Sequence, residues 1–137
     1  MKRFPRARVN PQFNSVSALG TGSFLFAMHT DALVVLTTVA SEDEAVRFVR
    51  ALLDRRIIAC GTLLPGARSL YRWQGKTADE REVVIMLKTR SGCLEALRTA
   101  FGELHPYKVP ELLALPVEAG TEKYLEWISG ETTLALA

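Results

Sequence analysis

The chain has 137 residues, of which 48% are hydrophobic and 23% charged, which is typical of one globular domain large enough to bury a core. No apolar run approaches the about 20 residues that a transmembrane helix needs, so we expect no membrane partner. The net charge of +2 combines a basic N-terminus, +4 over residues 1–30, with a slightly acidic remainder, and we therefore expect no nucleic-acid partner.

Residues 1–30 show no sustained hydrophobic periodicity and contain no acidic residue. We expect a flexible N-terminal arm or extension over residues 1–30, followed by a single domain over residues 31–137. The arm has some features of an organelle transit peptide, and Met28 is an alternative natural start; the sequence leaves both open.

The regular pattern begins with residues 33–36, an apolar run rich in β-branched residues that predicts a buried strand. Ser41 and Glu44 then have the spacing of a capping box, which opens a helix. The apolar residues that follow recur at helical spacing: Ala45, Phe48, Val49, Leu52 and Leu53.

The middle of the chain is typical of extended structure. Residues 57–64 predict a second strand, and the pair 65–66, Pro-Gly, is either a turn or a bend within a longer strand. Residues 69–73 alternate in the manner of a strand, residues 74–79 predict a polar turn, and residues 83–87 predict a central strand.

A second helix follows Ser91, which is placed to cap it. Its apolar residues share one helical face: Leu94, Leu97, Phe101 and Leu104. Pro106 disfavours helical dihedrals at His105, so we expect the helix to end there. Residues 112–117 predict a fourth strand, and residues 124–128 a short final helix that stops at Gly130.

The resulting order, β-α-β-β-α-β plus a C-terminal helix, is the split βαβ arrangement of ferredoxin-like α+β folds. Right-handed crossovers place both main helices on one face of a four-stranded antiparallel sheet. The strands are almost continuously apolar, so the opposite face also needs a cover. We expect that cover to come from self-association.

Short motifs also occur in a fixed order over about residues 33–130. They are Leu36-Thr37-Thr38, Ala59-Cys60, Leu64-Pro65-Gly66, Ser69-Leu70-Tyr71-Arg72-Trp73-Gln74-Gly75-Lys76, Glu82, Leu87-Lys88-Thr89, His105-Pro106-Tyr107 and Pro110-Glu111-Leu112. This ordered set resembles the CutA-type divalent-cation-tolerance proteins. The resemblance implies a ferredoxin-like trimer, akin in architecture to PII signalling proteins, with a link to copper and other divalent metals and no defining enzymatic activity. Gly61 departs from the family, which often has a larger residue there.

A metal site is the first functional hypothesis. Cys60 and His105 are soft or borderline donors that suit copper. No Cys-x-x-Cys, His-x-x-x-His or Glu-x-x-His spacing occurs, so any site must be built from distant segments or from several subunits. We expect no required cofactor, and copper or another divalent cation as a possible ligand.

A small-molecule cleft is the second hypothesis, because aromatic and charged residues gather at strand ends and loops. Its candidate residues are Tyr71, Trp73, Lys88, His105, Tyr107 and Glu111. The aromatic pair is equally compatible with packing between subunits, and Lys88 with an ion pair to Glu82 or Glu111. No glycine-rich phosphate loop is present.

A thiol enzyme built on Cys60, His105 and Glu111 is the weakest hypothesis, because a cysteine in an apolar strand has a raised rather than a lowered pKa. Two cysteines do not make a disulfide framework, which favours the cytoplasm. The sequence therefore predicts a non-enzymatic homotrimer in divalent-cation (copper) tolerance, or alternatively a small-molecule-sensing or scaffolding trimer.

Overall fold

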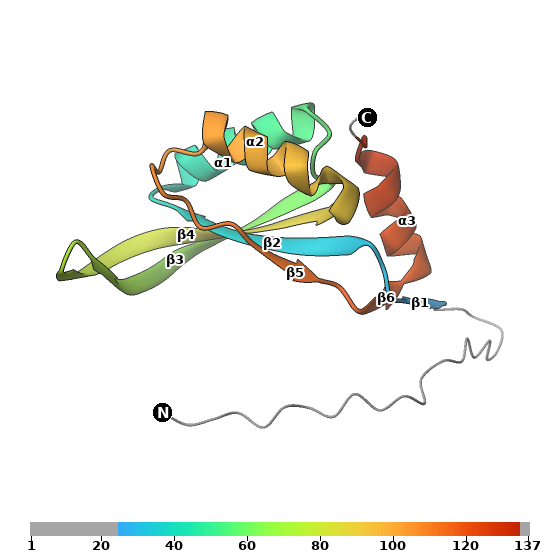
Figure 1. The fold of residues 1–137 in the computed structure, drawn as a ribbon, viewed down its shortest axis with the longest axis horizontal. Helices are drawn as coiled ribbons and strands as arrows, with labels where there is room; N and C mark the ends of the chain where they lie inside the picture. The colour runs from blue at the N-terminus through green and yellow to red at the C-terminus, as the bar shows by residue number, and fades with distance from the viewer. Residues whose placement is uncertain (1–24, 135–137) are drawn as a thin grey trace, which may run out of the picture.

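A four-stranded antiparallel sheet forms the centre of the computed structural model, which describes residues 25–134. The strand order is β3-β4-β2-β5, formed by β2 (Ala32–Val39), β3 (Cys60–Trp73), β4 (Lys76–Arg90) and β5 (Leu113–Pro116). Helices α1 (Glu42–Asp54) and α2 (Leu94–Leu104) cover one face of this sheet (Figure 1). This α+β arrangement is the one that the split βαβ pattern predicts.

Helix α1 begins as the sequence predicts. The Ser41 hydroxyl accepts a hydrogen bond from the Glu44 backbone N–H at 3.2 Å. The Glu44 carboxylate accepts in turn from the Ala40 backbone N–H, also at 3.2 Å, one residue earlier than in the standard capping box. These two bonds satisfy donors that would otherwise be unpaired at the start of the helix.

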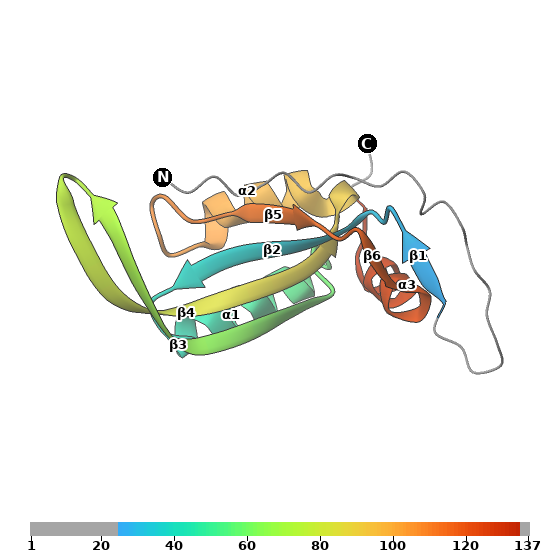
Figure 2. The same ribbon diagram turned by 90° about the horizontal axis from the view of Figure 1, so that it is seen from below.

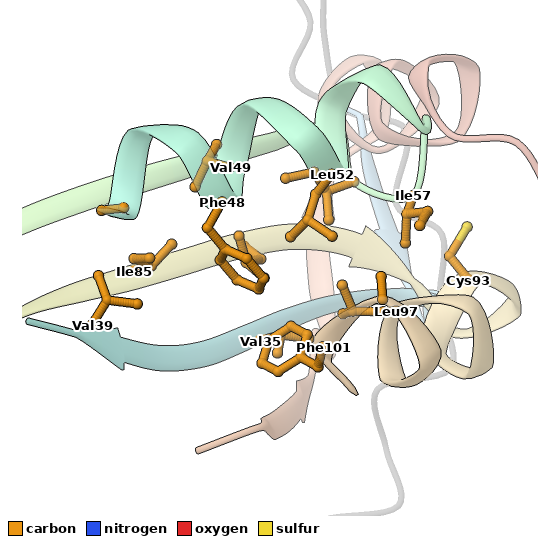
Figure 3. Close-up of a cluster of buried hydrophobic side chains, with 14 of the residues drawn as sticks. Val35, Val39, Phe48, Val49, Leu52, Ile57, Ile85, Cys93, Leu97 and Phe101 are labelled. Atoms are coloured by element: carbon orange, nitrogen blue, oxygen red, sulfur yellow. The ribbon is translucent and has the colours of Figure 1, made fainter. Parts of the chain in front are cut away.

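The hydrophobic core lies between the two helices and the sheet (Figure 3). Phe48 of α1 and Phe101 of α2 meet edge to face, with 5.0 Å between ring centroids. Val35, Ile85 and Leu97 are fully buried against them. The apolar helical faces read from the sequence therefore point at the sheet as expected, except for Leu53 in the last turn of α1, which is 38% exposed.

Strands β3 and β4 form a long hairpin that projects beyond the helices (Figure 2). Its turn contains only Gln74 and Gly75, so the predicted polar turn over residues 74–79 is wrong beyond its first two residues. The register shifts by one residue between Leu64 and Ala67, so residues 65–66 form a bulge in one long strand. Gly66 has φ = 80°, a backbone conformation that favours glycine.

Three other predicted boundaries are wrong. The second strand begins at Cys60, not at residue 57, because Ile57 and Ile58 instead turn into the core below α1. Ser91 makes no capping bond; it begins a 3₁₀ turn, η1 (Ser91–Cys93), and its N–H donates to the Asp31 carbonyl. Gly130 lies within helix α3 (Glu122–Glu131) rather than after it.

Two short strands outside the main sheet were not predicted. β1 (Phe26–Met28) pairs antiparallel with β6 (Ala119–Thr121), which leads directly into α3. The arm expected over residues 1–30 therefore ends differently, because its last residues pair with the C-terminal part of the domain. Residues 1–24 lie outside the described residues.

Neither α1 nor α2 covers the opposite face of the sheet, and α3 reaches it only at one end, where the Tyr124 hydroxyl lies 3.9 Å from Cys60 Sγ. Residues paired directly across antiparallel strands share a face, so the register defines this surface. We call it the open face; it carries Val34, Leu36, Thr38, Cys60, Thr62, Leu64, Val84, Met86, Lys88, Leu113 and Leu115. Within residues 25–134, no helix is long and apolar enough to span a membrane.

Candidate functional site

A groove of about 610 Å³ lies where the β3–β4 hairpin leaves the sheet. Three segments form its walls: the end of β2, the hairpin, and the loop that follows α2. Its lining residues are Thr38, Ser69, Tyr71, Trp73, Glu80, Glu82, Pro106, Tyr107, Lys108, Val109 and Glu111. The volume is within the range of small-molecule sites.

The bulge in β3 determines which hairpin residues face the groove. With regular pairing from Leu64 onward, Leu70 and Arg72 would share a face with the groove-lining carboxylates of β4. The extra residue shifts the alternation by one, so Tyr71 and Trp73 point to the groove instead. The position of the bulge therefore places both aromatic side chains in the site.

Glu82 and Tyr107 join the hairpin to the loop across the groove. The Tyr107 hydroxyl donates a hydrogen bond to Glu82 Oε2 at 2.8 Å. Glu82 is only 7% exposed, which is unusual for a carboxylate. Burial of the phenol, and next the bond to Glu82, raise the pKa of Tyr107, so the hydroxyl stays a donor at neutral pH.

His105 lies behind the groove wall and does not line it. Its Nδ1 accepts from the Tyr107 backbone N–H at 3.0 Å, which makes Nε2 the protonated nitrogen; Nε2 donates to the Thr37 hydroxyl at 3.0 Å. The ring also packs on Phe48 and Phe101. Burial lowers the pKa of His105. The imidazole is therefore neutral, and its two hydrogen bonds hold the loop in place.

Two further predicted site residues, Lys88 and Cys60, lie away from the groove, at the far end of the open face. Lys88 donates to the Thr62 hydroxyl rather than pairing with Glu82 or Glu111. Cys60 pairs with Lys88 across the strands, and its Sγ lies 3.9 Å from the Tyr124 hydroxyl.

The structure does not bring Cys60 and His105 together in one chain. Cys60 is on the open face, whereas the His105 ring is packed among the aromatic residues of the helical layer. No group of three or more His, Cys, Asp or Glu side chains within the described residues is arranged to hold a metal ion.

Four of the predicted cleft residues do line one groove: Tyr71, Trp73, Tyr107 and Glu111. The sequence reasoning missed Glu80 and Glu82 as groove residues. A signal for them existed, because they are two residues apart and so share one face of a strand. The prediction missed it because the expected strand began only at residue 83, whereas β4 begins at Lys76.

Three comparisons relate the chain to known proteins. The profile of a family described as CutA1 divalent ion tolerance protein matches residues 33–131. The divalent-cation tolerance protein CutA of Pectobacterium atrosepticum is 46% identical over 99 residues, which are 72% of this chain and 90% of that protein. Its counterpart in Thermus thermophilus is 40% identical over 99 residues, 72% of this chain and 96% of that protein.

Solved structures agree with the sequence relatives. The Thermus thermophilus protein superposes with a TM-score of 0.72 at 39% identity, covering 74% of this chain and 99% of that one. CutA from Synechococcus elongatus gives a TM-score of 0.75 at 33% identity, covering 79% and 96%. From its ordered motifs, its sheet topology and these matches, the chain belongs to the CutA1 divalent ion tolerance protein family.

Proposed function

We propose that the protein is a non-enzymatic homotrimer that acts in divalent-cation tolerance in the cytoplasm, with copper as the metal to test first. Family membership supports the tolerance role. The observation that supports the assembly is the open face, which is largely apolar and which α3 contacts only at the Cys60 end.

The open face has the properties of an interface. Leu64, Leu113 and Leu115 on it are 46%, 54% and 48% exposed, although each belongs to a strand. Apolar side chains gathered on one exposed face mark association sites. The outer strands β3 and β5 also leave unpaired edges, which favour contact with another chain. We propose three subunits because the resemblance to CutA-type proteins implies a trimer.

Cys60 is the stronger of the two proposed metal ligands. It lies on the open face, so association brings further copies of it to the interface, and thiolates suit copper in its reduced state. His105 would have to give up its bond from Tyr107 or its bond to Thr37 to coordinate a metal. We propose that His105 contributes only if the loop opens.

Isothermal titration with Cu⁺, Cu²⁺ and Zn²⁺ tests the metal proposal. Cys60→Ala should weaken Cu⁺ binding by at least tenfold, whereas removal of the buried thiol in Cys93→Ala should not. His105→Ala is compared with His29→Ala, the other histidine. Wild-type binding weaker than roughly millimolar, or under about 4 kcal/mol, would contradict a metal-binding role.

The groove favours a second candidate function, a small-molecule-sensing or scaffolding trimer. Its walls combine aromatic faces, hydroxyl groups and carboxylates at the base of a projecting hairpin. Such a mixed lining is typical of small-molecule sites. In this account the loop and the hairpin, joined by Tyr107 and Glu82, respond together to an occupant.

A further inference from the structure

We propose that the groove binds an organic cation whose head carries N–H groups, either an alkylammonium or a guanidinium. This inference rests on the second candidate function and gives it a ligand class.

The charge of the groove selects a cation. Glu80, Glu82 and Glu111 line it against the single cation of Lys108, a net charge of −2. Glu82 is the deepest determinant because it is 93% buried, from its exposure of 7%. Tyr107 donates to its Oε2, and no side-chain oxygen of the described residues is both buried and without a partner, so Oε1 keeps access to solvent. A largely buried carboxylate with one accessible oxygen is a strong acceptor for a cationic N–H donor.

The aromatic lining selects an organic cation in particular. Tyr71, Trp73 and Tyr107 place three aromatic rings along the groove. Trp73 is 49% exposed and Tyr71 39% in the single chain, and they lie on the continuation of the open face, so in the proposed trimer the groove is a cleft between subunits. The faces of such rings attract cations, and the apolar stem of an alkyl cation is stabilised by packing against them.

An inorganic divalent ion fits the groove less well. The carboxylates of the described residues do not converge in a group of three that could hold a metal. The loss of contact with water raises the pKa of the Tyr71 and Tyr107 hydroxyls most. The nearby Glu80 and Glu82 carboxylates raise both pKa values further. Charge spread along an aromatic groove suits an extended ligand with more than one cationic nitrogen.

Agmatine is a suitable probe because it carries a guanidinium and an ammonium on a four-carbon stem. Its control is N-(4-hydroxybutyl)urea, which has a similar length and similar N–H donors but carries no charge. We expect agmatine to bind the full-length protein about tenfold or more tightly than the control in isothermal titration, since the groove is negative. Equal affinities, or no agmatine binding at millimolar concentration, would overturn the inference.

Substitutions locate the binding. Glu82→Gln keeps an acceptor for Tyr107 but removes the charge, and it should weaken agmatine binding about tenfold. Glu126→Gln makes the same charge change on exposed α3 and should alter it less than about twofold. An unchanged affinity in Glu82→Gln contradicts the proposed site.

Two further readouts separate this inference from the functions it rests on. Trp73→Leu removes a groove ring without changing the charge. If the wild type binds the uncharged control as tightly as agmatine, and Trp73→Leu loses that binding, the groove stands as a site but the cation class is rejected. Sedimentation of the same samples reports assembly independently. A trimer that binds neither compound overturns the cation inference and leaves the tolerance proposal standing.

Discussion

His105 joins the groove loop, residues 105–111, to strand β2. Both nitrogens of its neutral ring take part in hydrogen bonds. Thr37 anchors one side and the Tyr107 backbone the other. Protonation would place a proton on Nδ1. This nitrogen could then no longer accept the hydrogen bond from the Tyr107 backbone N–H, and the two N–H groups would repel each other. The loop that carries Tyr107 and Glu111 is therefore coupled to the protonation state of one imidazole.

Acidification should destabilise the fold through His105. Burial lowers the pKa of this residue in the folded chain below its usual 6.5, so the unfolded chain binds more protons as the pH falls through 6.5. The contribution is full above that pH and is lost below it. Urea unfolding at pH 7.5 and 5.5 should show a stability loss that His105→Gln reduces. His29→Gln, at an exposed site, should keep the wild-type loss; equal pH dependence in both variants would contradict the account.

Tyr107→Phe tests the bond across the groove. The variant keeps the ring but removes the donor from a buried carboxylate, which should cost about 1–2 kcal/mol of unfolding free energy. Tyr124→Phe is the matched control, because that hydroxyl only faces the Cys60 sulfur at 3.9 Å, and its change should stay within about 0.5 kcal/mol. Equal losses in urea denaturation would show that Glu82 does not depend on Tyr107.

At the scale of elements, the helices and the buried strands could be predicted because their hydrophobic period is local. The bulge between Leu64 and Ala67 could not, since Pro-Gly fits a turn and a bend equally well until the pairing partner is known. That one residue decides whether Tyr71 or Leu70 faces the groove. The site was therefore half predictable: its residue types were visible, but their common face depended on a register that only the sheet defines.

Gly61 brings α1 close to β3 and does not leave loose packing. A Cβ at this position would lie 2.8 Å from Val49 Cγ1 and 3.2 Å from Leu87 Cδ2. Val49 is β-branched and moves little in a helix. The helix and the strand therefore meet at a contact that only glycine fits without adjustment.

Gly61→Ala should destabilise the protein by about 1–3 kcal/mol, as overpacking of a core does. Gly130→Ala is the control: its Cβ would meet nothing within 4 Å, and alanine is the better helix former, so it should be neutral or stabilising by up to about 1 kcal/mol. Thermal and urea unfolding of both variants measure the difference. A neutral Gly61→Ala would mean that Val49 and the helix shift easily.

At the scale of the whole molecule, two layers leave most of one face of the sheet without a cover. Its directly paired residues form apolar rows, such as Leu36 beside Met86 and Leu113. The sequence predicted this need for a cover because all four strands are apolar on both sides. The sequence did not show what covers this face, because the hydrophobic periodicity of one chain does not indicate which residues contact another chain. The proposed trimer, the position of Cys60 and the accessibility of the groove all depend on how this face is used.

Sedimentation equilibrium of the wild type and of open-face variants tests the central claim most directly. We expect the wild type at micromolar concentration to have three times the 15.2 kDa mass of the chain, and Leu113→Glu or Leu64→Glu to dissociate it, because each places a charge on the open face. Val46→Glu, on the exposed side of α1, should leave the trimer intact. A stable folded monomer of the wild type, or a trimer that both open-face variants preserve, would contradict the account.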